Sequence, residues 1–141
     1  MTEEKSPSTL SVGKMGEDAA CKYLTKQKYK ICARNYRHGR CEIDIIAKKD
    51  GFIVFFEIKA RSFSPENLST SELYRPADAV TFEKRKNVIK AAMNYLREEQ
   101  EEERVRFDVL EVYFLKKKDK LKLHRINHIE SAFDARGHII Y

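Results

Sequence analysis

Apolar residues recur at helical spacing in two stretches of the chain. In residues 12–28 they follow one another at intervals of three to five, which makes an apolar stripe along one helix face. Ser11 is a candidate N-cap, and Gly13 and Gly16 would let another element approach this helix closely. A second helix is expected over residues 76–103, because a proline suits its first turn and its apolar residues show the same spacing.

Four further segments have the pattern of β-strands. Residues 41–47 are apolar on one face, and residues 52–60 are almost continuously apolar, as in a central strand covered on both faces. The Asp-Gly pair at residues 50–51 predicts a hairpin turn between these two strands. Two more strands are expected at residues 106–115 and 121–126.

The remaining segments are expected to be irregular. Residues 1–11 are polar and predict a flexible lead-in to a single domain over residues 12–141, and residues 62–75 predict a long polar loop. The acidic run at 98–103 is expected to lie solvated on the last turns of the second helix, and residues 129–133 to form one helical turn. The order helix, strand, strand, helix, strand, strand predicts an α/β domain with a mixed sheet.

Composition narrows the class of protein. The chain has 141 residues, of which 42% are hydrophobic, enough for the core of one domain. No stretch approaches the roughly 20 apolar residues of a membrane span. The polar N-terminus lacks the apolar region of a signal peptide, so a cytoplasmic protein with no membrane partner is expected. No glycine-rich phosphate loop is present, and no organic cofactor is expected.

The positive charge is concentrated in one segment. The net charge is +6, and residues 26–61 carry ten Lys or Arg against four Asp or Glu, which accounts for the whole excess. A concentrated positive field suggests a polyanionic partner such as nucleic acid. Arg34, Arg37, Arg40 and Arg61 are therefore candidates for phosphate contacts. A solvated basic surface is the alternative for the segment and for each arginine.

Three charged residues interrupt the two central strands. Asp44 lies in the first strand, and Glu57 and Lys59 lie two apart in the second, so that both point to one face. The hairpin would bring Asp44 close to Glu57, and two carboxylates so placed repel unless a cation lies between them. Mg²⁺ or Mn²⁺ is the expected cation, and Lys59 would orient a water or neutralise phosphate charge. The alternative is a structural ion-pair network.

Each predicted helix adds one charged residue to this picture. Glu17 lies at the edge of the apolar stripe of the first helix, and Lys84 lies between Val80 and Val88 on the second, at spacings of four. Both side chains are therefore expected to face the sheet and the same site. The alternative is that Glu17 and Lys84 flank the apolar faces with only their stems buried.

A set of short segments carries a family resemblance: GKMGEDAACKYL, RNYR, EIDIIA, FFEIKAR, AVTFEK, AAMNYL and RFDVLEV. Together these segments resemble the YraN family, a bacterial family of inferred endonucleases similar to archaeal Holliday-junction resolvases. The resemblance covers about residues 13–133. One departure is Cys41, where the family usually has glycine before the EID motif.

The resemblance implies a restriction-endonuclease-like three-layer fold of the PD-(D/E)xK type, with a mixed central sheet flanked by helices. It also implies that Asp44 and Glu57 bind the metal and that Lys59 is the catalytic lysine. Glu17 would complete the site, and Lys84 would be an auxiliary polar residue. By analogy with the resolvases, a homodimer is expected.

The predicted function is a metal-dependent nuclease, a magnesium-dependent endonuclease that hydrolyses phosphodiester bonds of DNA, with branched or junction DNA as one candidate substrate. Two alternatives remain open. A non-catalytic nucleic-acid-binding module would keep the basic segment and would need no Mg²⁺. A protein-interaction factor would use the positive patch on an acidic partner and would bind no nucleic acid at low salt.

Overall fold

Five strands and two helices make up the part of the chain that the computed structural model describes, residues 9–65 and 80–140. In chain order they are α1 (Thr9–Lys26), β1 (Lys30–His38), β2 (Cys41–Lys49), β3 (Phe52–Phe63), α2 (Phe82–Glu98), β4 (Arg104–Lys117) and β5 (Lys120–Phe133). Neither helix is long and apolar enough to cross a membrane.

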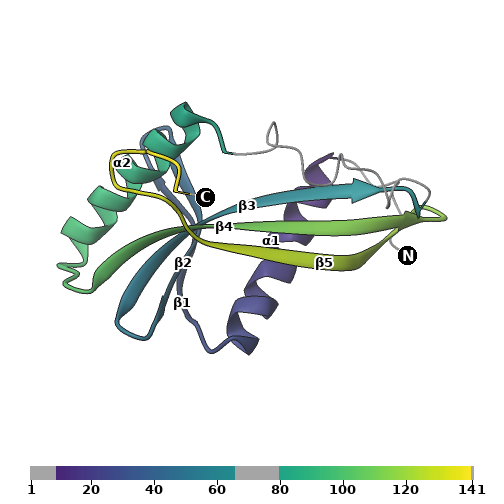
Figure 1. Ribbon diagram of the computed structural model, residues 1–141, viewed down its shortest axis with the longest axis horizontal. Helices are drawn as coiled ribbons and strands as arrows, with labels where there is room; N and C mark the ends of the chain where they lie inside the picture. The colour runs from purple at the N-terminus through teal and green to yellow at the C-terminus, as the bar shows by residue number, and fades with distance from the viewer. Residues whose placement is uncertain (1–8, 66–79, 141) are drawn as a thin grey trace.

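The strands form one mixed sheet in the order β1-β2-β3-β4-β5. Only β3 and β4 are parallel, and the other neighbours are antiparallel. The helices cover opposite faces of the sheet, and β3, β4 and β5 continue past the paired part of β2 as a long extension (Figure 1). This is the expected α/β architecture with a mixed central sheet, and it is consistent with a restriction-endonuclease-like fold.

β3 is the centre of the core, as its continuous apolar run predicts. Its residues 53–56 are fully buried, and successive side chains enter different clusters because a strand alternates its faces. Val54 and Phe56 pack with Leu24 of α1. On the other face, Ile53 and Phe55 belong to the cluster of α2 that holds Val88, Ala91, Ala92 and Tyr95. A helix is thus held on each face of the strand.

Close approach of α1 to β3 depends on a glycine. A Cβ atom on Gly16 would lie 2.5 Å from the Cβ atom of Ala60, so any side chain there would push the helix off the strand. The expectation for Gly16 is confirmed, whereas Gly13 has open space around it. Ser11 lies inside α1 rather than at its cap, because the helix already includes Thr9.

α2 is shorter than its periodicity predicts. It begins at Phe82 after the N-cap Thr81, whose hydroxyl accepts a hydrogen bond from the Lys84 amide at 3.2 Å. The expected start at Pro76 lies outside the described residues. The helix ends at Glu98, and the acidic run then leads to β4. Glu101 lies 2.6 Å from Nζ of Lys48 on β2, so the expectation that the whole run is merely solvated is wrong.

The strands differ from expectation mainly at the sheet edges. β1 is absent from the predicted elements, because its polar and half-buried residues give no clear alternation. β5 runs through residues 129–133, where the sequence predicts a helical turn, and its Ile129 pairs with Val109 of β4. β3 continues to Phe63 along β4, so the expected loop begins later. The rest of that loop, residues 66–75, lies outside the described residues.

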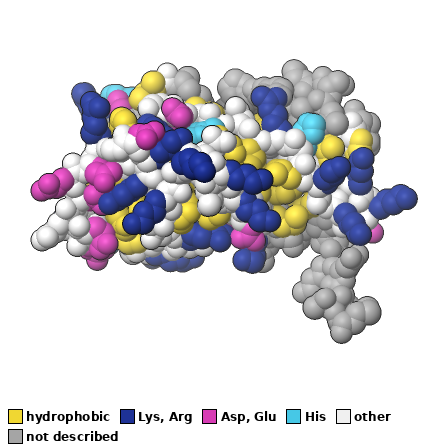
Figure 2. All heavy atoms as spheres, turned by 90° about the horizontal axis from the view of Figure 1, so that it is seen from below, with side chains coloured by type: hydrophobic (Ala, Val, Ile, Leu, Met, Phe, Trp, Pro, Cys, Tyr) yellow, Lys and Arg dark blue, Asp and Glu magenta, His cyan; other side chains and the backbone are white. Residues whose placement is uncertain are grey.

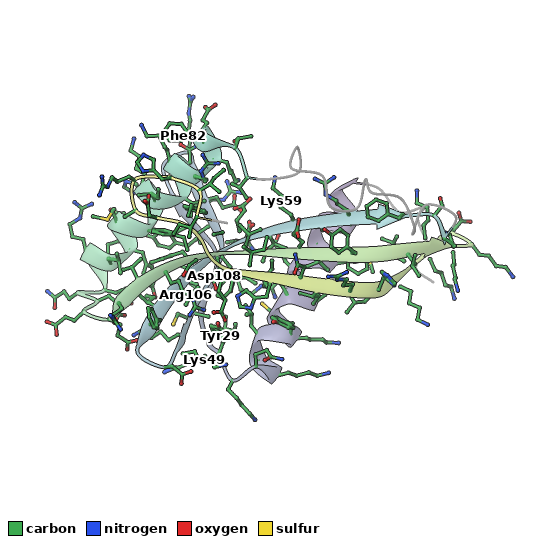
Figure 3. All side chains as sticks on the ribbon, viewed as in Figure 1. Tyr29, Lys49, Lys59, Phe82, Arg106 and Asp108 are labelled. Atoms are coloured by element: carbon green, nitrogen blue, oxygen red, sulfur yellow. The ribbon has the colours of Figure 1, made fainter. Side chains whose placement is uncertain are left out.

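A buried carboxylate ties β4 to β5. Asp108 is fully buried and accepts hydrogen bonds from Nε and Nη2 of Arg106, both at 2.9 Å, and from the Ser131 amide at 3.0 Å. Nε2 of His128 lies 2.7 Å from the same carboxylate. Arg106 also donates to the Tyr29 hydroxyl at 2.6 Å (Figure 3). The Asp108 charge is thus compensated where the β4–β5 register shifts.

We expect Asp108→Ala to lower the free energy of unfolding by about 3–5 kcal/mol, because the largely buried Arg106 would lose the carboxylate that compensates its charge. The matched control is Asp18→Ala, which removes an exposed Asp–Arg pair of the same length, 2.9 Å to Arg34. The Asp18→Ala variant should lose less than about 1 kcal/mol of its free energy of unfolding. Urea denaturation of both variants measures the difference, and equal losses would contradict the structural role of Asp108.

Candidate active site

β2 and β3 separate at two facing carboxylates. Their pairing runs from Lys49 opposite Phe52 to Ile45 opposite Phe56 and stops there, although both strands continue. The next position of the register sets Asp44 opposite Glu57. We call this point the fork. The ladder between β1 and β2 also omits Asp44. The residue opposite it in β1 is Asn35, whose backbone is left-handed with φ 53°.

The Asp44 side chain replaces a backbone acceptor at the fork. Its Oδ2 atom accepts a hydrogen bond from the Ile58 amide at 2.8 Å, an amide that has no β2 carbonyl opposite it. Burial raises the pKa of Asp44 above its ordinary value, and this hydrogen bond together with Lys84 opposes the rise. Asp44 therefore fixes the fork and also contributes a carboxylate to it.

Glu57 is a buried carboxyl with incomplete partners. It is 4% exposed, and its Oε2 atom has no hydrogen-bond partner among the described residues. Nζ of Lys84 lies 3.7 Å from Oε1 and reaches the site from α2. Burial and the neighbouring Asp44 raise the pKa of Glu57 to about 8, against the opposing effect of Lys84 and Lys59. Without a further cation, Glu57 keeps a proton near neutral pH.

Glu17 reaches the fork from the other helix. Its Oε1 atom is buried and has no hydrogen-bond partner among the described residues. Burial and Asp44 raise the pKa of Glu17, while Arg34 and a hydrogen bond from Asn35 oppose the rise. Glu17 and Asp44 line one groove, so the two acids lie near each other. The contact of Gly16 with β3 brings the neighbouring Glu17 to this position.

A groove of about 540 Å³ opens beside the fork. Glu17, Asp44 and Lys59 line it, and Glu57 and Lys84 meet at the buried side of the fork. The groove continues past Lys59 along β3. Its lining includes Val12, Gly13, Ile58, Ala60, Arg61, Ser62, Phe63 and Lys116. The structure therefore gathers all five residues that the sequence analysis selected for catalysis, two of them from helices on opposite faces of the sheet.

The four candidate arginines are not gathered in this way. Arg61 lines the groove. Arg34 pairs with Asp18 of α1 at 2.9 Å and lies close enough to Glu17 to lower its pKa. Arg37 pairs with Glu42 at 3.1 Å, and Arg40 is exposed at the β1–β2 turn. Arg61 is thus the one of the four that shares a cavity with the carboxylates.

Sequence reasoning misses three residues of the site. Asn35 donates a hydrogen bond to Glu17. The only sequence signal for Asn35 is that it lies in the RNYR segment. Lys116 and Phe63 line the groove. The sequence pattern places Lys116 in a turn and Phe63 in a loop, because apolar periodicity does not reveal how far β3 and β4 continue beside each other.

The donor set suits a hydrated cation. Among residues 9–65 and 80–140, no three His, Cys, Asp or Glu side chains form a ready-made metal cage. Two carboxyl groups instead face each other, and one of them, Glu57, leaves a buried oxygen without a partner in the described part of the chain. Mg²⁺ typically takes one or two protein carboxylates and fills its other positions with water and phosphate oxygens. The residues of the fork fit that requirement.

Comparisons with known proteins agree on one family. Residues 16–112 match the model of the uncharacterised protein family UPF0102. A UPF0102 protein of Bacteroides fragilis is 39% identical over 122 residues, which cover 86% of this chain and 91% of the relative. One from Chlorobium phaeobacteroides is 39% identical over 126 residues, 88% of this chain and 94% of the relative.

A third relative, a UPF0102 protein of Clostridioides difficile, is 40% identical over 122 residues, which cover 86% of this chain and 95% of the relative. The matched region contains Glu17, the fork and Lys84, so the family model covers every residue that contributes a carboxylate or lysine to the fork. The chain belongs to the UPF0102 family, which is the YraN family that its motifs resemble.

Proposed function

We propose that this protein is a metal-dependent nuclease that hydrolyses phosphodiester bonds of DNA. The observation that carries the proposal is the fork, where Asp44 and Glu57 face each other beside a groove that also holds Lys59. A buried carboxyl pair is costly to the fold unless a cation or a proton compensates it. Such a pair, beside a lysine in a solvent-accessible groove, supports a catalytic site.

Asp44 and Glu57 would hold Mg²⁺ or Mn²⁺, with Glu57 giving up the proton that its raised pKa retains. When bound, the cation supplies Lewis-acid polarisation of a phosphate oxygen and a lowered pKa of its water. Lys59 would orient the attacking water and stabilise the negative charge that grows on the phosphate. Glu17 would hold a water opposite Asp44, and Lys84 would limit the charge on Glu57.

The distribution of charge supports DNA as the substrate. Arg61 and Lys116 line the groove that leads to the carboxylates. On the face in Figure 2, Lys and Arg side chains are widely spread, and acidic side chains gather mainly towards the left end. Phosphate contacts of this kind provide affinity and position without reading the base sequence.

Branched DNA and a homodimer extend the same proposal. A junction presents equivalent strands to be cut, and two copies related by a twofold axis would place one site on each. Gel filtration or analytical ultracentrifugation, with and without a junction oligonucleotide, tests this part independently of cleavage.

One contact favours a second candidate, a nucleic-acid-binding module without catalysis. Lys84 lies 3.7 Å from Glu57 and lowers its pKa, so it compensates part of the charge with no metal present. Such a module would bind DNA equally well with Mg²⁺ or with a chelator, and it would cut none. Comparison of binding and cleavage in both conditions separates the two functions.

We expect Mn²⁺ binding, measured by calorimetry, to be lost in Asp44→Asn and in Glu57→Gln. Undiminished Mn²⁺ binding in both variants would refute the assignment of the metal site to Asp44 and Glu57. The fold should survive both changes. The amide oxygen that replaces the Asp44 carboxylate can still accept the hydrogen bond from the Ile58 amide, and Glu57→Gln removes a buried ionisable group.

The Glu57→Gln variant also tests the raised pKa of Glu57, through the pH dependence of protein stability. Because this pKa is raised from 4.5 to about 8, the folded state holds more protons than the unfolded state between these values, and metal-free stability should fall as pH rises through that window. Glu57→Gln should flatten the fall and be more stable than the wild type near pH 8. Thermal unfolding between about pH 4.5 and pH 8.5 measures this, and parallel curves would contradict the raised pKa.

We expect Lys59→Met to reduce the rate of DNA cleavage by on the order of 10²-fold or more, the usual effect of losing one positioned electrostatic group. The substrates are branched, flapped, single-stranded and duplex DNA with Mg²⁺ or Mn²⁺. Lys49→Met is the matched control, since Lys49 lies over the Tyr29 ring, outside the groove (Figure 3). Normal cleavage by Lys59→Met would refute the catalytic role, and failure to fold would favour a structural ion-pair network.

We expect the salt dependence of DNA affinity to identify the binding face. Each phosphate contact contributes roughly −0.9 to the slope of log K against log salt on duplex DNA. Replacing Arg61 and Lys116 by alanine should therefore make the slope shallower by up to about two units. The paired control replaces Arg37 and Arg40, which lie outside the groove. If only the control pair changed the slope, the DNA would lie over the β1–β2 turn instead.

A further inference from the structure

The part of β3 that extends past β2 carries a row of four side chains. Glu57, Lys59, Arg61 and Phe63 are two apart along the strand, so they lie on one face, at steps of about 6.6 Å. β2 leaves β3 at the fork, while β4 continues to pair with it as far as Phe63. The row therefore runs from the carboxyl pair along the groove, and it changes from acid to lysine, arginine and finally an aromatic ring.

Phe63 has a supported ring that the core does not use. It belongs to neither of the two core clusters that the described residues form. Its ring lies 5.9 Å from that of Tyr113, tilted by 34°, and Tyr113 is itself buried. Phe63 is half-buried and lines the groove together with Arg61 and Lys116. A ring that packs against a buried tyrosine and lines a groove with two cationic side chains has the surroundings of a stacking surface.

We propose that Phe63 stacks on an unpaired base of a DNA strand whose phosphates follow β3 to the fork. The inference rests on the proposed function and names its substrate class, DNA with a single-stranded segment beside the cut. Aromatic rings and cations in one groove are the general means of holding single strands. The bases inside a duplex are covered by their neighbours and leave no face for the ring, whereas flaps, overhangs and opened junctions offer one.

The size of the groove agrees with this occupant. Its volume of about 540 Å³ lies in the range of clefts that enclose a small organic ligand, roughly 300–1,000 Å³. α1 contributes Val12 and Gly13 to its lining beside the β3 residues. One unpaired base therefore suits the part of the groove at Phe63, and the three strand steps from Phe63 to Glu57 leave room for the few nucleotides that lead to the fork, with the duplex outside.

The test measures binding in the presence of a chelator, so that no strand is cut. Fluorescence anisotropy compares a duplex that has a single-stranded overhang with a blunt duplex of the same paired sequence. The wild type should bind the overhang DNA more tightly. Phe63→Leu should weaken that binding on the order of 10-fold, the scale of losing one stacked base, and leave the blunt duplex and the salt slope unchanged. Phe63→Trp should retain the preference.

Phe82→Leu is the matched control. Phe82 is 52% exposed on α2 and lies outside the groove, apart from Lys59 in Figure 3. The control variant should bind both DNA molecules as the wild type does. Equal affinity of the wild type for the two DNA molecules would overturn the inference, and so would equal effects of Phe63→Leu and Phe82→Leu.

A second measurement needs no variant. A 2-aminopurine base placed in the overhang should lose fluorescence when the wild type binds, because stacking quenches it, and unchanged fluorescence at every overhang position would overturn the inference. Cleavage with Mg²⁺ is measured separately. A protein that binds overhangs through Phe63 and cuts no DNA keeps this inference and refutes the nuclease. A protein that cuts DNA without preferring overhangs keeps the nuclease and refutes this inference.

Discussion

The separation of β2 from β3 at two facing carboxyl groups is the feature on which the site depends. A sheet normally continues its ladder until a strand ends, because unpaired backbone groups are costly. Here the Asp44 carboxylate accepts a hydrogen bond from the Ile58 amide, so the pairing of β2 with β3 can stop while β3 continues. The same side chain then faces Glu57 and opens a groove beside β3. One acidic residue thus ends the pairing of β2 with β3 and also places a carboxylate in the groove.

The fork also lets both helices reach one point. α1 and α2 pack on opposite faces of the sheet, and an unbroken sheet would keep their side chains apart. Glu17 arrives from α1, next to the glycine that permits close contact with Ala60. Lys84 arrives from α2 and lies 3.7 Å from Glu57. The site therefore joins three layers of the fold, and small shifts of either helix would alter its charge balance.

Two buried acids in this molecule have contrasting surroundings. Asp108 is held by Arg106, His128 and the Ser131 amide, so its charge is compensated and it connects β4 to β5. Glu57 has a lysine at 3.7 Å, an opposing carboxyl group and one oxygen without a partner among the described residues, and its pKa rises to about 8. The first arrangement stabilises a fold, whereas the second keeps a cost that a bound cation would relieve.

The sequence by itself determined the central hairpin of residues 41–60, the two amphipathic helices and the five charged residues of the site, because these depend on local periodicity and on two strands joined by a short turn. Only the tertiary structure decided the rest. β1 and the end of β5 are edge segments whose polar residues carry no clear period, and their pairing depends on neighbours. Phe63 and Lys116 line the groove because β3 and β4 run parallel past the fork. The whole of α2 separates these two strands in sequence, so their pairing is long-range and no local pattern encodes it.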